Sequence, residues 1–373
     1  MVITDRGEIA TETVTINLGP HHPSTHGVFR MVVTLDGETV VDMVPKFGYL
    51  HRGIEKLAEE RTYVQTMPLV DRLDYICPMT NEHAFCLAIE KLAGLEVPER
   101  AEYIRVIMDE LTRIMSHILA AGFLWNELGA TFTPMIYAFR QRENLMDLFE
   151  MASGARMFHN YIRPGGVVAD LPEGWVTQAR KVLDTLDRFL DEFDALTAEN
   201  EIFLVRAIDV GVLPAQLAVN CGISGPVLRA SGVRYDVRLA EPYSVYDRFD
   251  FEVPIQKHGD VYDRYRQYIA ETHQSIRIIR QALDALPEGP VRNEKAKRLR
   301  PPVGEAYARI ESPKGDLGFY LVSEGGQQPY RCHIRSSCLM NLTALRQMVI
   351  GHKIQDLVII FGSINVTMAD IDR

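Results

Sequence analysis

The densest group of titratable side chains in this sequence is formed by His21, His22 and His26, close to the N-terminus. Imidazole is a common zinc or iron ligand, but the surrounding sequence offers neither a cysteine nor a carboxylate to complete such a site. A loop histidine can also hold backbone carbonyls in place. With an unperturbed pKa of about 6.5, it can equally donate a proton near neutral pH. The residues alone leave these three interpretations open.

A second polar group lies at residues 71–75, where the sequence reads DRLDY between an apolar run and a predicted helix. One interpretation is an Arg/Asp network that closes a helix terminus, with Tyr75 half buried. The other is chemical, because a tyrosine can donate a hydrogen bond to a substrate carbonyl and follow with its proton as charge develops.

Several other chemistries find no support in the sequence. It contains no GxGxxG motif, no P-loop and no GxSxG motif, which argues against nucleotide binding and a serine hydrolase. An iron–sulfur cluster commonly needs four thiolates, whereas the five cysteines are scattered: Cys77, Cys86, Cys221, Cys332 and Cys338. We therefore expect no bound metal, and any redox role must depend on a substrate or cofactor bound elsewhere.

The composition is that of an ordinary globular protein, with 47% hydrophobic and 24% charged residues among 373. A net charge of −10 argues against a nucleic-acid-binding surface, which needs a basic face. No run approaches the roughly 18 apolar residues of a membrane span, and residues 1–12 lack the pattern of a signal peptide. We expect a chain that is soluble or attached to a membrane through partners, in a reducing compartment.

The elements that position these groups begin with strands. Residues 13–18 alternate polar with apolar side chains, and the runs 31–35 and 38–44 flank Asp36-Gly37, a strong hairpin signal. Residues 19–27, which carry the three histidines, include two prolines and two glycines. This segment is therefore expected to be a loop.

Helical periodicity dominates the middle of the chain. Apolar side chains recur at three- and four-residue steps in four stretches, 104–119, 135–152, 176–196 and 259–286, which predicts a bundle. Beyond a proline-rich segment at 287–302, the sequence predicts strands at 305–311, 318–322, 330–334 and 357–361 and a helix at 342–350. The expected fold is α+β and mainly helical, with a β-rich N-terminal subdomain (1–52), a central long-helix bundle (53–290) and a small C-terminal α/β subdomain (291–373).

Residues 19–27 (GPHHPSTHG) resemble the GPQHPSTHG signature of the 49 kDa subunit (the D or H component) of complex I, the NADH–quinone oxidoreductase. The resemblance continues in order over essentially the whole chain. Its further matches are 48–56 (GYLHRGIEK), 71–75 (DRLDY), 154–157 (GARM), 162–167 (IRPGGV), 224–232 (SGPVLRASG), 313–315 (PKG) and 370–373 (DIDR).

That family is similar in fold to the large subunit of nickel–iron hydrogenases, where two CxxC motifs hold the metals. The corresponding segments here are residues 74–77, with one cysteine, and 367–370, with none. One thiol cannot build a dithiolate-bridged dinuclear centre. The resemblance therefore implies that hydrogenase activity is absent and that a quinone headgroup binds where the metal once lay.

The resemblance also assigns roles to individual residues. Tyr75 and His26 correspond to the family's hydrogen-bond donors to the two quinone carbonyls. Electrons would come from an iron–sulfur cluster in the adjacent subunit, and Arg52 corresponds to a family arginine near that cluster. Glu127 stands where the family usually has an aspartate that pairs with the histidine. Two further departures are Asn365, where aspartate is common, and His21, which replaces a glutamine.

The implied function is that of a peripheral-arm subunit of a proton-pumping NAD(P)H– or ferredoxin–quinone oxidoreductase. Its expected partners are the iron–sulfur subunit with the terminal cluster, the 30 kDa-type subunit and the membrane-arm subunit that carries the quinone channel. Its expected location is the cytoplasmic side of the bacterial inner membrane, through those partners. The alternatives are an energy-converting, membrane-bound hydrogenase subunit and a purely structural scaffold.

Overall fold

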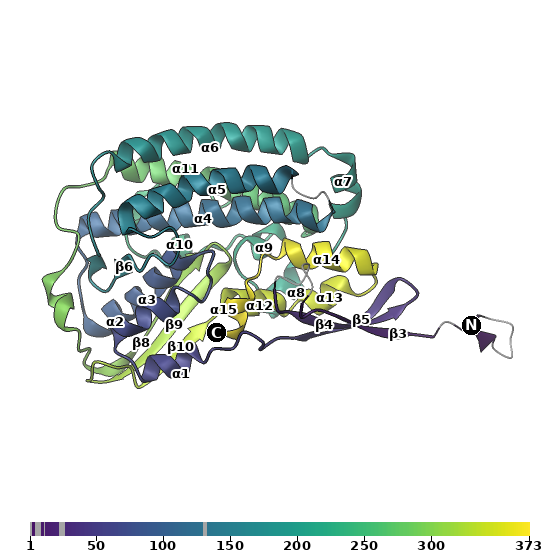
Figure 1. The fold of residues 1–373 in the computed structure, drawn as a ribbon, viewed down its shortest axis with the longest axis horizontal. Helices are drawn as coiled ribbons and strands as arrows, with labels where there is room; N and C mark the ends of the chain where they lie inside the picture. Colours follow the sequence, from purple (N-terminus) through teal and green to yellow (C-terminus); the bar gives the residue numbers. More distant parts are fainter. Residues whose placement is uncertain (1, 4–8, 11, 22–26, 130–132) are drawn as a thin grey trace.

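The computed structural model describes residues 2–3, 9–10, 12–21, 27–129 and 133–373, and it confirms an α+β fold, with more residues in helices than in strands. Figure 1 shows a layer of long helices on one side and small sheets with short helices on the other. The two three-stranded sheets in the described part of the chain have the orders β3-β4-β5 and β10-β9-β8. Two-stranded ribbons join β1 (Val2–Ile3) to β2 (Ile9–Ala10) and β6 (Ile162–Arg163) to β7 (Gly166–Val167).

The N-terminal sheet follows the sequence prediction. It consists of β3 (Val14–Leu18), β4 (Arg30–Asp36) and β5 (Thr39–Lys46), all antiparallel. Every second residue of β4 is buried, which is the period of a strand with one face on the core. Gly37 has φ +61°, so the turn between β4 and β5 uses the left-handed conformation that glycine adopts without strain.

The helical layer contains four helices of more than twenty residues. They are α4 (Glu99–Glu127), α5 (Thr133–Ser153), α6 (Trp175–Thr197) and α11 (Val261–Asp284), and they run side by side in Figure 1. The apolar stripe of α6 is buried, from Val182 to Phe193, as the periodicity predicts. Asp260 caps α11 by accepting a hydrogen bond from the backbone N–H of Asp263 at 2.7 Å.

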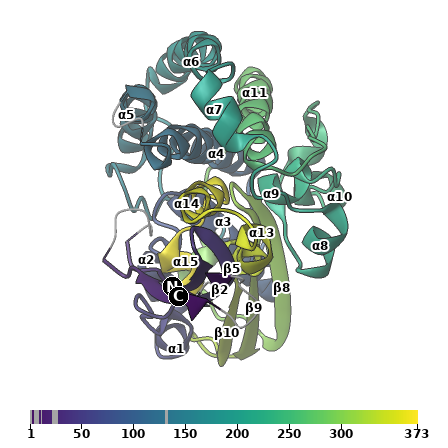
Figure 2. The ribbon, with the colours of Figure 1, turned by 90° about the vertical axis from the view of Figure 1, so that its right-hand side faces the viewer.

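Shorter helices connect these layers. They are α1 (Ile54–Glu59), α2 (Tyr63–Val70), α3 (Pro78–Ala93), α7 (Glu201–Ala207), α8 (Ala215–Asn220), α9 (Gly225–Ala230) and α10 (Val237–Ala240), with 3-10 turns at Tyr246–Arg248 and Glu294–Arg298. Figure 2 shows the long helices at one end of the molecule and the sheets at the other, with α8 to α10 along one flank.

The C-terminal part combines a sheet with four short helices. The strands are β8 (Val303–Ser312), β9 (Gly315–Glu324) and β10 (Arg331–Arg335), and the helices are α12 (Ser337–Leu342), α13 (Leu345–Val349), α14 (Ile354–Ser363) and α15 (Met368–Asp372). Helix α3 packs on this sheet, where the rings of Phe85 and Phe319 lie 5.3 Å apart between centroids.

The prediction of a strand at residues 357–361 is wrong, because this run forms the middle of α14. All five of its residues except the half-buried Val358 are buried, and α14 contacts α4, α11 and α13. A short continuous apolar run fits a buried helix as well as a buried strand, so periodicity could not separate them.

Charged side chains join the helical layer to its neighbours inside the protein. Glu110 of α4 is fully buried and accepts hydrogen bonds from Arg238 at 3.0 Å, Tyr246 at 2.7 Å and Ser275 at 2.6 Å. These partners come from α10, the following 3-10 turn and α11. Loss of Arg238 would remove a cation that faces the buried Glu110 carboxylate, so the network fixes how these helices meet. Within the described residues, we find no helix of sufficient length and apolar character to cross a bilayer.

Candidate functional site

A cavity of about 290 Å³ lies between the helical layer and the C-terminal helices, and we call it the α4–α5 pocket. Its walls are mostly apolar, as is usual for a site that holds an organic ligand. The lining residues come from α4 (Met115, Leu119, Ala120, Phe123, Asn126, Glu127), α5 (Phe139, Arg142, Met146), the segment before and at the start of α3 (Tyr75, Ile76, Pro78), the segment after α5 (Arg156, Met157, His159) and the end of α14 with its linker (Gly362, Asn365, Val366, Thr367).

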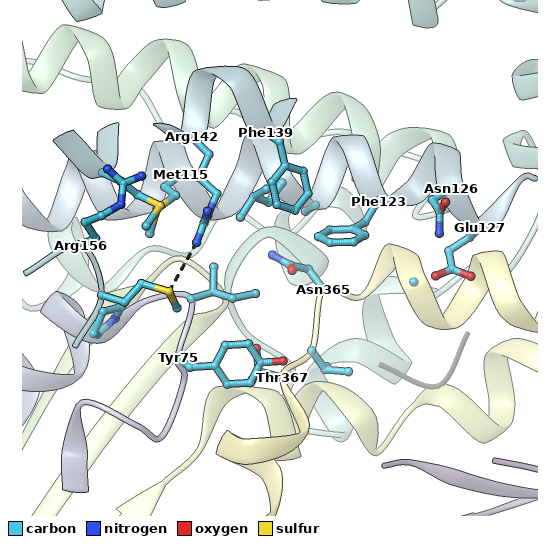
Figure 3. Close-up of a pocket in the computed structure, with 18 of the residues that line it drawn as sticks. Tyr75, Met115, Phe123, Asn126, Glu127, Phe139, Arg142, Arg156, Asn365 and Thr367 are labelled. Carbon is cyan, nitrogen blue, oxygen red and sulfur yellow. Dashed lines mark hydrogen bonds between the residues drawn. The ribbon is translucent and has the colours of Figure 1, made fainter. Parts of the chain in front are cut away.

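Tyr75 lies below this pocket in Figure 3, next to Thr367. Its position is set by a tight turn in which the Asp74 carbonyl accepts the Cys77 N–H at 2.9 Å and the Asn81 amide at 3.0 Å. The Tyr75 side chain is 37% exposed, so it opens onto free space. Burial raises the pKa of Tyr75 above its usual value, while the nearby Lys314 charge opposes this rise. The phenol is therefore protonated at neutral pH and can donate a hydrogen bond.

Glu127 lines the same pocket from the last turn of α4. Burial raises the pKa of its carboxyl group to about 7, so the group titrates near neutral pH. Gly362 makes room for it, because a Cβ at this position would lie 2.9 Å from the Glu127 Cγ. In Figure 3 Glu127 lies at the right-hand end of the pocket, beside Asn126.

Three further polar residues of the pocket were not predicted from the sequence as site residues. Arg142 donates to the Met157 sulfur at 3.6 Å, the contact that Figure 3 marks. His159 is 6% exposed, its Nε2 lies 3.2 Å from the Arg156 carbonyl oxygen, and burial lowers its pKa to about 4. Its ring is therefore neutral at physiological pH. Arg156 was quoted only as part of a family motif, and it pairs with Glu143, Asp147 and Glu150 of α5.

Asn365 reaches the pocket from the linker between α14 and α15. Its φ of +54° lies in the left-handed region, which asparagine tolerates better than most residues. Its amide donates to the Ser116 hydroxyl of α4 at 3.3 Å. Thr367, two residues further along the chain, also lines the pocket.

Arg52 does not line the α4–α5 pocket but holds the backbone that surrounds it. Its guanidinium donates to the carbonyls of Arg72 at 2.8 Å and Ala369 at 2.7 Å. Burial lowers its pKa, and the neighbouring carboxylates Asp370 and Asp372 oppose this. Asp372 in turn accepts the N–H groups of residues 48 and 50, each at 2.7 Å. The motifs at 48–56, 71–75 and 370–373 thus meet in one place.

The segments 74–77 and 367–370 also meet, through Asp74, the residue before Tyr75. The Thr367 hydroxyl donates to the Asp74 carboxylate at 2.9 Å, and the Lys314 ammonium lies 2.8 Å from the same carboxylate. A lysine cation thus occupies the space between the two segments. The described residues include no group of three or more His, Cys, Asp or Glu side chains arranged to hold a metal ion.

The structure therefore brings Tyr75 and Glu127 to one pocket, whereas Arg52 is not part of the pocket wall and bonds to the carbonyls of Arg72 and Ala369. The predicted donor His26 lies outside the described residues, as does His22. His21 is described and exposed. The structure thus leaves the position of His26 relative to Tyr75 and Glu127 as a prediction.

Comparison with known proteins identifies the family. The family described as "Respiratory-chain NADH dehydrogenase, 49 Kd subunit" matches residues 127–301 and 296–373. The D subunit of NADH-quinone oxidoreductase from Dehalococcoides mccartyi strain 195 is 57% identical over 365 residues, which cover 98% of this chain and 100% of the relative. The D 1 subunit of the same enzyme from Roseiflexus sp. strain RS-1 is 56% identical, and the D subunit from Geotalea uraniireducens is 47% identical, with the same coverage. The chain belongs to the family of the 49 kDa subunit of respiratory-chain NADH dehydrogenase.

Proposed function

We propose that this chain is the quinone-site subunit of an NADH–quinone oxidoreductase of the complex I type. The observation that carries the proposal is the α4–α5 pocket, an apolar cavity with a protonated tyrosine and a titratable carboxyl group in its wall. The relatives' names supply the reaction class, since they are subunits of NADH-quinone oxidoreductase. The chain acts as part of that enzyme and is inactive alone.

In this proposal the quinone headgroup enters the pocket and its two carbonyls meet Tyr75 and His26. Two electrons make each carbonyl oxygen strongly basic, and a fixed donor at each end stabilises the charge and supplies a proton. The apolar wall excludes water and strengthens both hydrogen bonds. The electrons arrive from an iron–sulfur cluster in the adjacent subunit, and Arg52 favours the reduced state of that cluster through its positive charge.

Glu127 is proposed to pair with His26. Its side chain is one methylene longer than the aspartate usual in the family. The space beside Gly362 accommodates the longer stem, so the carboxyl group keeps its place at the end of the pocket. With a pKa near 7, it can exchange a proton with the histidine at little cost.

The relation to the hydrogenase large subunit is likewise part of the proposal. Segments 74–77 and 367–370 correspond to the two metal-binding motifs of that protein. Here they are joined by the hydrogen bond from Thr367 to Asp74, and the buried Lys314 ammonium contacts both residues. A cation in that position disfavours a second one. Hydrogenase-type metal chemistry is therefore disfavoured. We also keep the division into residues 1–52, 53–290 and 291–373 as a proposal, in which α3 of the second segment packs on β8 and β9 of the third.

The proposed setting is the peripheral arm, on the cytoplasmic side of the bacterial inner membrane. The partners are the iron–sulfur subunit with the terminal cluster, the 30 kDa-type subunit and the membrane-arm quinone-channel subunit. Two apolar residues of the pocket wall, Phe123 and Met157, are each more than a third exposed, which is consistent with coverage by a partner.

The test is Tyr75→Phe in the purified, intact complex. We expect NADH-driven quinone reduction to fall by about 100-fold, in the range for loss of one proton donor. Reduction of a hydrophilic acceptor that takes electrons before the quinone site should not change. Tyr330→Phe is the matched control, since Tyr330 is 63% exposed and lies on the β9–β10 side of the molecule. Unchanged quinone reduction in Tyr75→Phe would favour a scaffold role.

A further inference from the structure

Lys314 is a buried cation close to the pocket, and the proposed function has not assigned it a role. It lies in the two-residue turn between β8 and β9 and is 2% exposed. Its ammonium contacts the Asp74 carboxylate at 2.8 Å and donates to the Thr367 hydroxyl, which itself donates to Asp74 at 2.9 Å. The three groups form a closed triangle. Asp74 adjoins Tyr75, and both Tyr75 and Thr367 line the pocket.

The turn that carries Lys314 is held in place by the motif at 224–232. A Cβ on Gly315 would lie 2.4 Å from the Ser224 hydroxyl, so no side chain fits there, and φ at Gly315 is +125°. Ser224 also accepts the Asp316 N–H at 3.0 Å. Asn341 of α12 accepts the Ser224 N–H at 3.1 Å and donates to the Lys314 carbonyl at 2.8 Å. Two family motifs, 224–232 and 313–315, thus fix the backbone of one lysine.

The surroundings keep this lysine charged. Burial by itself lowers the pKa of Lys314, but the Asp74 carboxylate beside it raises the pKa above its usual value. Asp370 also faces the thiol of Cys338. The positive charge acts in turn on Tyr75, whose pKa is raised by burial, lowered by Lys314 and raised by Asp74. The cation and the phenol are therefore electrostatically coupled.

We propose that Lys314 is a positioning residue for quinone reduction, whose buried ammonium holds Asp74 and Thr367 beneath the pocket and offsets the negative charge left on Tyr75. The inference rests on the proposed function. In the step concerned, the O–H bond of Tyr75 breaks and its proton passes to a quinone oxygen made basic by electrons that come from NADH. The phenolate that remains beside Lys314 is then reprotonated from water.

The double variant Lys314→Met/Asp74→Asn separates this role from simple neutralisation of Asp74. It removes both buried charges together, so no charge is left unpaired. We expect an assembled complex in which kcat for quinone reduction falls on the order of tenfold. The reason is that loss of the lysine charge raises the pKa of the Tyr75 donor, and one pKa unit is a factor of ten in the acid dissociation constant of the donor. KM should change little, and the alkaline limb of the pH profile should move to higher pH. Lys56→Met, which removes a surface ion pair with Glu59, is the control.

Asp74→Asn alone provides a second test that preserves the shape of the site. It removes the carboxylate that offsets the lysine charge, so that charge acts more strongly on Tyr75. The alkaline limb of the pH profile should therefore move to lower pH, in the direction opposite to the double variant. Wild-type kcat and pH profile in the double variant, or shifts of both variants in one direction, would overturn the inference. If the double variant does not assemble, Asp74→Asn alone tests the inference: a shift of the alkaline limb to lower pH supports it, and any other result overturns it.

Tyr75→Phe is measured alongside these variants. If Tyr75→Phe loses activity while the double variant has wild-type activity and pH profile, the role of Lys314 is refuted and the proposed quinone site is retained. Full activity in Tyr75→Phe would remove the donor itself, and with it both proposals.

Discussion

Replacement of Glu127 by glutamine tests the electrostatics of the pocket. The Glu127 carboxyl group has a pKa of about 7 in the folded protein because it is buried, against 4.5 as the ordinary value. Between these two pH values the folded state binds more protons than the unfolded state, so stability falls as pH rises through this window and is level above it. Glutamine has a similar shape and cannot ionise, so Glu127→Gln removes this contribution.

The size of the effect follows from the shift. A rise of this size corresponds to roughly 3 kcal/mol at most, since one pKa unit is about 1.4 kcal/mol. Contact with solvent in the pocket reduces this energy. We therefore expect the advantage of Glu127→Gln over the wild-type chain in unfolding free energy to grow from near zero at pH 4.5 to about 1–3 kcal/mol at pH 7.

The assay is urea unfolding of the purified chain at pH 4.5, 5.5, 6.5 and 7.5, followed by circular dichroism. Glu173→Gln is the control, because Glu173 is exposed near the start of α6. A stability difference between wild type and Glu127→Gln that is the same at every pH would refute the reasoning, since it would mean that the carboxyl group has an ordinary pKa in the folded protein.

Two further predictions concern the framework around the pocket. Asp372→Ala removes the acceptor of two backbone N–H groups in the segment with Arg52. We expect the free energy of unfolding to fall by about 1–3 kcal/mol and hydrogen exchange at residues 48 and 50 to become faster. Unchanged exchange at these two residues would contradict this prediction. Phe319→Ala opens a cavity where α3 packs on the sheet. Thermal unfolding should show that the protein loses about 3–5 kcal/mol of stability. A loss of stability below about 1 kcal/mol would contradict this prediction and show that the neighbouring side chains fill the cavity.

The sequence predicted most elements of the fold because their signals are local. The Asp36-Gly37 turn between alternating strands and the apolar stripes of α4, α5, α6 and α11 each appear within a few turns of chain. The misassigned run at 357–361 has no such signal, because a helix buried on several sides is apolar at nearly every position. Its contacts with α4 and α13 belong to the tertiary structure and cannot be read from the local sequence.

The site was predictable only in part, for a related reason. Tyr75, Glu127 and Asn365 were singled out through the family resemblance, but the pocket also takes Arg142 from α5 and His159 from the segment after it. No local pattern marks these two residues, since they share a wall with the others only after α5 packs against α4. Lys314 stood in a quoted motif, yet its contact with Asp74 joins segments far apart in the sequence and is visible only in the fold.

The most direct measurement is a structure of the assembled complex with a quinone analogue bound. We predict that the headgroup lies in the α4–α5 pocket with the Tyr75 hydroxyl and the His26 ring at opposite carbonyl oxygens. A headgroup held in a different cavity, with these two side chains facing away from each other, would contradict it.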